Sequence, residues 1–191
     1  MSQLNPNYPS LRVEDYIIRK ATLADRSDIE SLIEHSARGL SQHDYSEEQI
    51  EAAIDTVFGV DTDLIRDGTY FVAEAAGSLV GCGGWSKRRN LFGGDRFQNR
   101  EAGELDPTRE PAKIRAFFVH PDWARKGIAK SILSLCESEA RAYGFRSAEL
   151  MATLPGVRLY EACGYERGEP VMHVMESGIK LPLMPMKKAL G

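Results

Sequence analysis

The sequence predicts a single domain of mixed α/β class. The chain has 191 residues, which is close to the usual length of one domain. Segments with helical periodicity alternate along it with short apolar segments typical of strands. In the second half, a buried strand, a turn and an amphipathic helix follow one another directly, as in a strand–helix–strand unit. The chain contains no internal repeat and no low-complexity stretch.

The first part of the chain predicts a lead-in, a strand and two helices. Residues 1–15 are polar and contain prolines, so we expect a flexible lead-in before a folded domain of residues 16–191. Tyr16–Arg19 is a short strand candidate. The sequences Thr22-Leu-Ala-Asp25 and Ser46-Glu-Glu-Gln49 match the capping box, and each precedes apolar residues at helical spacing.

The middle of the chain predicts a hairpin and then a long loop. Residues 69–74 and 78–82 are strand-like and are joined by Ala76-Gly77, which favours a hairpin. The glycines of Gly81-Cys-Gly-Gly84 suit either close packing or a bend that faces a substrate. Residues 86–112 are mostly polar and too many for a hairpin turn, so we expect a long insertion loop.

The third part predicts a core strand and a long helix. Ile114–Val119 is typical of a buried strand. From Gly127 to Gly144 the apolar residues follow helical spacing, and Gly144 suits the end of a helix. Residues 147–152 are a strand candidate, and a short helix follows that ends by Gly164.

The last part predicts further strands. We expect strands from Tyr165 onward and at Ile179–Met186. Proline cannot donate a hydrogen bond to a neighbouring strand, so Pro182 and Pro185 restrict the last strand to a sheet edge or a bent path.

The composition points to a protein of the cytoplasm. Lys+Arg 24 and Asp+Glu 28 give a net charge of −4, which argues against nucleic acid as a partner, because such binders usually carry a basic excess. Three distant cysteines without C-x-x-C spacing, and four histidines without H-x-H or H-E-x-x-H spacing, predict neither a disulfide framework nor a metal site. The N-terminus does not resemble a signal peptide and no apolar run could cross a bilayer, so we expect no membrane partner.

The net charge conceals an uneven distribution. Residues 1–80 hold 6 Lys or Arg and 15 Asp or Glu, a net −9, whereas residues 81–191 hold 18 and 13, a net +5. One half could therefore face anions and the other cations.

The turn before the long helix is a candidate anion site. A helix that begins at Gly127 leaves several backbone N–H groups without partners at its N-terminus, and Gly127 permits close approach of a ligand. Arg125, Lys126 and Lys130 add positive charge there. We infer a site for phosphate or pyrophosphate. The alternative is an ordinary helix start with solvated basic side chains, and the turn by itself does not decide between the two.

Two motifs in a fixed order resemble a known family. Val119-His-Pro-Asp-Trp-Ala-Arg-Lys-Gly-Ile-Ala129 resembles motif A of the GNAT superfamily of N-acetyltransferases, which usually reads Gln/Arg-x-x-Gly-x-Gly/Ala. Leu159-Tyr-Glu-Ala-Cys-Gly-Tyr165 resembles its Tyr-Glu-x-x-Gly-Phe/Tyr segment. Ala124 stands at the usual Gln/Arg position, and Thr153 stands where many members have Asn. The resemblance implies one GNAT-like domain over residues 16–191, with a mixed, mostly antiparallel twisted sheet and helices on both faces.

The same resemblance implies acetyl-CoA as co-substrate and no metal. The main chain of the strand before motif A would pair with the pantetheine arm and hold the thioester carbonyl, and the turn would hold the pyrophosphate. The residues that this assigns to cofactor binding are Phe117, Phe118, Val119, Ala124, Arg125, Lys126, Gly127, Ile128, Ala129 and Lys130.

The resemblance also assigns a catalytic role to Tyr160, as the acid that protonates the departing thiolate of CoA. The ordinary pKa of tyrosine lies above that of a thiol, so we expect help from a hydrogen bond rather than full prior proton transfer. The alternative is an aromatic side chain that only packs in the core. No general base can be carried over, because Lys113 and Arg115 occupy the polar positions of the preceding strand.

Several candidates for the base and several functions stay open. Glu110, Glu74 and His120 are candidate bases, each with a structural role as the alternative, and a water chain or a neutral amine would also suffice. We predict acetyl transfer to a primary amine, in a small molecule or a peptide, by direct attack in a ternary complex. The alternatives are another acyl group, a hydroxyl acceptor, or a CoA-binding sensor without catalysis. Homodimers are common in the family, and the acidic half favours a cationic acceptor.

Overall fold

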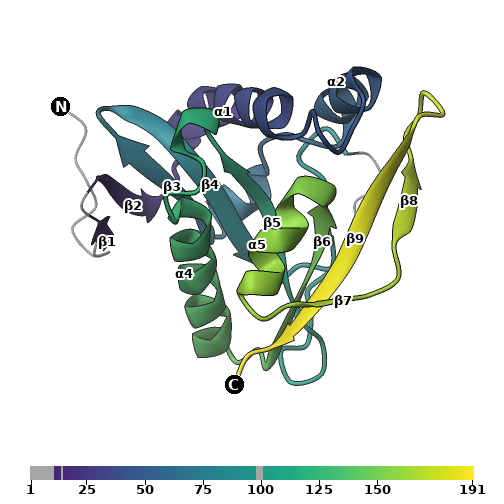
Figure 1. Cartoon of the computed structure of the whole chain (residues 1–191). Helices are drawn as coiled ribbons and strands as arrows, with labels where there is room; N and C mark the ends of the chain where they lie inside the picture. The colour runs from purple at the N-terminus through teal and green to yellow at the C-terminus, as the bar shows by residue number, and fades with distance from the viewer. Residues whose placement is uncertain (1–10, 14, 98–100) are drawn as a thin grey trace.

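A computed structural model describes residues 11–13, 15–97 and 101–191 of the chain. In this part, nine strands form one sheet in the order β1-β2-β3-β4-β5-β6-β9-β7, and β8 also pairs with β9 (Figure 1). The strands are β1 (Leu11–Val13), β2 (Tyr16–Lys20), β3 (Tyr70–Ala75), β4 (Ser78–Ser86), β5 (Ala112–Val119), β6 (Ser147–Thr153), β7 (Glu166–Arg167), β8 (Val171–Val174) and β9 (Lys180–Ala189). The α-helices are α1 (Arg26–Leu40), α2 (Glu47–Thr56), α3 (Thr62–Arg66), α4 (Ile128–Tyr143) and α5 (Val157–Ala162).

The sheet is mixed and mostly antiparallel. Among the described strands, β5 and β6 alone pair in parallel, and α4 makes the crossover between them. All other pairs are antiparallel. The predicted α/β class and the predicted mixed, mostly antiparallel sheet are therefore confirmed. The parallel pair needs a crossover connection, and α4 is the long helix that supplies it.

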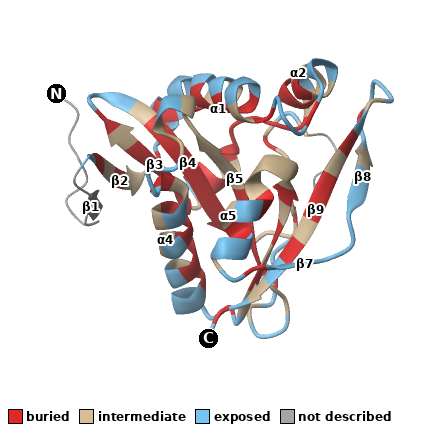
Figure 2. Cartoon of the chain, in the orientation of Figure 1, coloured by how far each residue is buried: buried red, intermediate tan, exposed pale blue. Residues whose placement is uncertain are grey.

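Helices cover both faces of the sheet, and each face has its own apolar core. Alternate residues of β3 separate the two cores: Phe71 and Ala73 face α4 and α5, whereas Tyr70 and Val72 face α1, α2 and α3. Figure 1 shows α4 and α5 crossing the near face of the sheet, with α1 and α2 beyond its upper part. In Figure 2 each long helix is buried toward the sheet and exposed on its outer side, which is the pattern of an amphipathic helix.

Both predicted capping boxes form. The Asp25 carboxylate accepts from the Thr22 amide (2.7 Å) and closes a 3₁₀ turn, Leu23–Asp25, directly before α1. At α2 the Gln49 amide donates to Ser46 Oγ (3.2 Å), and the Ser46 amide donates to Gln49 Oε1 (2.9 Å). Local sequence therefore determines where both helices begin.

The structure describes part of the expected lead-in and part of the expected long loop. Residues 1–10 and 14 of the expected lead-in lie outside the described residues, and residues 11–13 of it form β1, which pairs with β2. Residues 98–100 of the expected 86–112 loop also lie outside them. The described remainder of that loop between β4 and β5 has no helix or strand beyond an isolated bridge, Arg88 to Glu104.

Of the two paths expected for the last strand, a sheet edge or a bent path, the sheet edge is wrong. β9 pairs with β6 on one side and with β7 and β8 on the other. The Pro182 carbonyl oxygen accepts from the Tyr45 hydroxyl (2.7 Å) on the β6 side of β9. The pairing with β6 ends at Leu183, so no β6 residue stands opposite Pro182. Pro185 points its carbonyl to the Gly168 amide (2.8 Å), in the gap between β7 and β8. In an antiparallel ladder the N and C=O of one residue face the same side, so neither proline removes a ladder bond.

The glycines of β4 allow close packing. An added Cβ at Gly81 would lie 2.4 Å from Ile128 Cγ2, so this glycine lets the first turn of α4 approach the sheet. An added Cβ at Gly84 would lie 2.8 Å from the Thr69 carbonyl oxygen and 3.0 Å from the Leu64 side chain.

Gly84→Ala should therefore lower the free energy of unfolding by about 1–3 kcal/mol, because the backbone of Thr69 cannot move aside without disturbing β3. The matched control is Gly59→Ala, whose added Cβ meets nothing within 4 Å. Urea unfolding of both variants measures the difference. An equal loss in the two would mean that close packing at Gly84 is not the cause.

Candidate functional site

The sheet separates between β5 and β6, and an irregularity in β5 coincides with the separation. The two strands pair only from Ala112 to Ile114, although both continue further. Ala116 follows in the left-handed region, with φ +60°, and the register of β5 against β4 shifts there by one residue. This is a β-bulge, which bends a strand and interrupts its pairing.

A buried network holds the bulge. The Tyr70 hydroxyl donates to the Ala116 carbonyl oxygen (3.2 Å), and Cys82 Sγ lies 3.3 Å from that hydroxyl and 3.7 Å from the same oxygen. Burial raises the pKa of Tyr70, and it raises the pKa of Cys82 to about 12. Both groups therefore keep their protons at neutral pH and remain donors to the bulge.

A pocket occupies the separation, and we call it the split pocket. Its walls come from β5 (114–118), β6 (151–153), residues 57–59 after α2, residues 92–94 of the long loop, Tyr160 and Leu183. Of the sequence-predicted site residues, this pocket brings together Phe117, Phe118 and Tyr160. The bulge thus places main chain of β5 opposite a tyrosine of α5.

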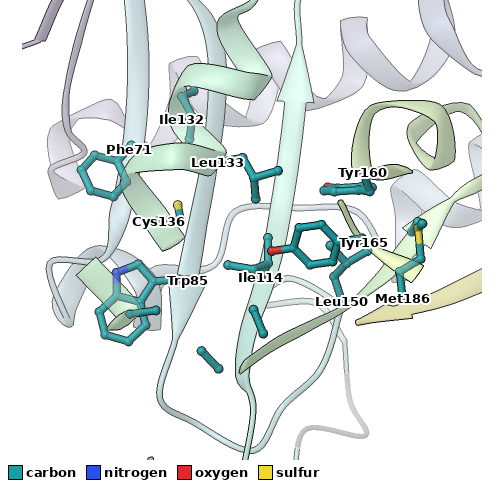
Figure 3. Close-up of a cluster of buried hydrophobic side chains, with 14 of the residues drawn as sticks. Phe71, Trp85, Ile114, Ile132, Leu133, Cys136, Leu150, Tyr160, Tyr165 and Met186 are labelled. Atoms are coloured by element: carbon teal, nitrogen blue, oxygen red, sulfur yellow. The ribbon is translucent and has the colours of Figure 1, made fainter. Parts of the chain in front are cut away.

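Tyr160 lies on α5 and is 7% exposed. Its ring contacts Phe117 and Tyr165 edge-on, with ring centroids 6.2 and 5.7 Å apart. Figure 3 shows Tyr160 and Tyr165 close together beside Leu150 and Met186. Burial raises the pKa of Tyr160, and its hydroxyl bonds to no described residue, so at neutral pH it is a protonated donor at the pocket wall.

A buried ion pair supports the opposite wall. Arg115 of β5 lines the pocket, forms an ion pair through Nη2 with Asp61 Oδ2 (2.8 Å) and donates from Nη1 to the Asn90 carbonyl oxygen (2.9 Å). Both charged side chains are almost completely buried, at 3% and 0% exposed. The pair joins β5 to the N-terminus of α3 and to the start of the long loop.

The predicted anion turn has the geometry that anion binding needs. Arg125 and Gly127 both have positive φ, +64° and +81°, and α4 begins at Ile128. Within the described chain, no N–H group of residues 125–130 donates to a backbone oxygen, and the first turn of α4 has no acidic residue. These N–H groups, together with the positive end of the helix dipole, favour an anion.

The cations of the turn are exposed and available. None of Arg125, Lys126 and Lys130 forms an ion pair with a residue that the structure describes. Lys126 Nζ lies 4.1 Å from the centre of the Trp123 ring. The neighbouring Ala124 and Ala129 are half-buried, and the Ile128 side chain is buried in the core.

Two backbone N–H groups at the end of β5 already have hydrogen-bond partners. The His120 amide donates to the Val80 carbonyl (3.0 Å), so His120 and, two residues earlier, Phe118 face β4. By alternation Val119 faces the other way. Its amide donates to Ser36 Oγ of α1 (3.2 Å). A ligand that uses the Val119 amide would thus replace Ser36, a partner that no sequence motif indicated.

None of the three candidate bases lines the split pocket. Glu110 lies in the long loop and pairs with Arg89, and backbone and arginine hydrogen bonds lower its pKa. Glu74 of β3 pairs with Arg19. His120 accepts from the Asp122 amide (3.3 Å) and stacks on His35. Arg115 and Tyr160 are the titratable residues that the described part of the chain contributes to the lining.

The long loop contributes to the site in a way that no sequence motif indicated. Gly94 donates its amide to the Val57 carbonyl (3.0 Å), and Asp95 donates its amide to the Val60 carbonyl (2.8 Å) and accepts from the Thr62 amide (2.9 Å). An added Cβ on Gly94 would lie 2.6 Å from the Gly59 backbone. The segment is therefore fastened to the α2–α3 connection and forms a wall of the site. The glycines of this segment are the sequence feature that could have indicated this wall.

The sequence matches the model of the acetyltransferase (GNAT) family over residues 28–165. A search of curated proteins returned no match. No helix in the described ranges is long and apolar enough to cross a membrane.

Solved structures share the fold at low sequence identity. A GCN5-related N-acetyltransferase from Rhodopseudomonas palustris has a TM-score of 0.68 at 18% identity, over 94% of this chain and 98% of that one. The PaiA N-acetyltransferase from Thermoplasma acidophilum, in complex with coenzyme A, has a TM-score of 0.60 at 16% identity, over 91% and 98%. YncA from Salmonella typhimurium, with its cofactor acetyl-CoA, has a TM-score of 0.61 at 19% identity, over 93% and 95%.

Asp61→Asn should lower the free energy of unfolding by about 3 kcal/mol or more, because it leaves the buried Arg115 without its counter-charge while keeping an oxygen for the cap of α3. The control is Asp122→Asn, an exposed acid that should change stability by less than about 0.5 kcal/mol. Chemical unfolding compares the two. Adding Arg115→Met to Asp61→Asn should recover part of the loss, and a further loss instead would contradict this account of the pair.

Proposed function

The chain belongs to the GNAT family of acetyltransferases, and we propose that it transfers the acetyl group of acetyl-CoA to a primary amine. The observation that carries the proposal is the combination of the split pocket, with Tyr160 at its wall, and the turn before α4, whose amides at residues 125–130 donate to no backbone oxygen in the described part of the chain. The acetyl-CoA and CoA bound in two of the structural neighbours add support by analogy.

We assign the CoA phosphates to the turn and the pantetheine arm to β5. The N–H groups of residues 125–130 and the charges of Arg125, Lys126 and Lys130 suit a pyrophosphate, whereas the Ala124 amide already donates to the Pro121 carbonyl oxygen (3.1 Å). Ala124 contributes no side-chain contact there, so the amides and the neighbouring cations carry the binding. Along β5 the main chain of Phe117 and Val119 offers hydrogen bonds to an extended ligand, while Phe118 faces β4 and contributes pocket wall.

In the transfer step the amine nitrogen attacks the thioester carbonyl carbon in a ternary complex. The nitrogen–carbon bond forms first, and the carbon–sulfur bond then breaks. An N–H group of β5 directed at the carbonyl oxygen stabilises the negative charge that develops on it, an effect of about 3–4 kcal/mol where such donors have been removed.

Tyr160 supplies the proton for the departing sulfur. Burial keeps the phenol protonated, and no described residue competes for its hydrogen. Because its pKa is raised further above that of a thiol, the phenol assists by a hydrogen bond to sulfur that strengthens as the carbon–sulfur bond breaks. The proton that passes to sulfur as CoA leaves is replaced on the phenol by the proton that the attacking nitrogen loses as the amide forms, so the products are the amide, the CoA thiol and neutral Tyr160. The acceptor ammonium loses its own proton to water or to a group at the pocket entrance before attack.

A CoA-binding module without catalysis is the second candidate. The observation that favours it is the lack of a carboxylate or an imidazole in the described lining of the split pocket. Calorimetry with acetyl-CoA and thiol release with a panel of amines separate the two. Binding together with thiol release supports the transferase, binding without release supports the module, and failure to bind acetyl-CoA rejects both.

Tyr160→Phe should lower kcat by about a hundred-fold or more while the Kd for acetyl-CoA stays unchanged, because only the proton donor is lost. Tyr143→Phe is the matched control: Tyr143 is 49% exposed on α4, outside the pocket, and should leave kcat as it is. Thiol release at saturating amine measures both. Wild-type turnover in Tyr160→Phe would reject Tyr160 as the acid.

Gly127→Ala should weaken acetyl-CoA binding by about ten-fold or more, because a side chain at this position keeps the pyrophosphate from the amides and sacrifices a charge-assisted hydrogen bond. Gly178→Ala is the control. Both glycines have positive φ and open space around them, so each variant should lose about 1 kcal/mol of stability. Only Gly127→Ala should change the Kd in calorimetry, and equal Kd values would contradict a phosphate site at this turn.

A further inference from the structure

A second pocket lies beside the split pocket, and we call it the hairpin pocket. Its lining comes from three segments: residues 55–57 at the end of α2, Arg96 and Phe97 of the long loop, and residues 173–176 of β8 and the turn that follows. Val57 lines both pockets. The two pockets are therefore neighbours on the same side of the molecule.

Three aromatic rings form the partition between the pockets. Phe92 lines the split pocket, whereas Phe97 and His173 line the hairpin pocket. The ring centroids lie 5.0 Å apart for Phe92 and Phe97, 5.3 Å for Phe92 and His173, and 5.7 Å for Phe97 and His173. An acceptor that reaches from one pocket to the other therefore lies against these rings.

The charges of the hairpin pocket favour a cation. Asp55 and Glu176 are exposed carboxylates, and neither forms an ion pair or a hydrogen bond with a residue in the described ranges. Arg96 is the opposing charge, and its guanidinium donates to the Ile54 carbonyl (3.1 Å). Burial lowers the pKa of His173, so its ring is neutral at neutral pH. Neutral aromatic rings attract a cation further through their faces.

We propose that the hairpin pocket binds a positively charged group at the far end of the acceptor, whose reacting amine extends past the three rings into the split pocket. The acceptor class is then a linear amine with a second positive charge. This inference rests on the proposed acetyl transfer, and it assigns a role to the long loop and to the β8–β9 hairpin, which that function alone leaves unexplained.

The test compares linear diamines of increasing length with the monoamine of equal length. The wild-type protein should show a kcat/KM about ten-fold higher for the best diamine than for its monoamine, as expected for one well-placed charge pair. The Asp55→Asn/Glu176→Gln double variant should lose this ratio and keep its activity toward the monoamine. Glu169→Gln removes an exposed acid from the same hairpin region outside the pocket, and should leave the ratio unchanged.

Lowering the pH gives a second readout. Protonation of His173 adds a positive charge between Asp55, Glu176, Arg96 and the bound cation, so the ratio should fall as the pH drops below neutrality. His173→Phe keeps an aromatic ring and removes the charge. It should retain the diamine preference at neutral pH and lose most of the pH dependence.

The outcomes separate this inference from the proposed function. Equal kcat/KM for diamines and monoamines, or a ratio that survives in the double variant, overturns the cation site and leaves acetyl transfer intact. A wild-type protein that binds acetyl-CoA and acetylates no amine overturns the transferase and this inference together.

Discussion

The left-handed backbone at Ala116 is the constraint on which the site depends. It bends β5 where pairing with β6 stops, and the pocket opens at that point. A non-glycine residue in this conformation costs about 1–2 kcal/mol, so the surroundings must hold it in place. The hydroxyl of Tyr70 and the thiol of Cys82 do so from β3 and β4. The network lies on the face of the sheet covered by α1 to α3, whereas Tyr160 belongs to the other.

The two faces of the sheet thus carry different parts of the candidate site. One side, with α4 and α5, carries the anion turn and the phenol, and both come from the basic part of the chain. The other side, with α1 to α3, comes from the acidic part and holds the bulge through Tyr70 and β5 through Asp61. The charge difference between residues 1–80 and 81–191 therefore has a spatial counterpart on the two sides of one sheet.

Local sequence predicts the parts of this structure that local forces determine. Capping boxes mark the starts of α1 and α2, and the glycine after α4 marks its end. The motifs predict Tyr160 and the turn before α4 as site residues, because each motif is a short local stretch of sequence. The bond between Ser36 and Val119, the ion pair of Asp61 with Arg115, and the wall formed by residues 92–97 depend on chain segments far apart in sequence, so periodicity and spacing could not reveal them. The interrupted partners of β9, which accommodate its prolines, are likewise a property of the whole sheet.

The interrupted pairing on the outer side of β9 has a consequence for solubility. The outermost strand position beside β9 is filled by two short strands, β7 and β8, which are separated by residues 168–170. Val171, Met172 and Val174 are exposed there. A long, continuous apolar strand at this border would offer a template on which other chains could assemble into aggregates, and a short strand beside a break is a common protection. The glycine and proline at 168 and 170 thus keep the border of the sheet from recruiting further strands.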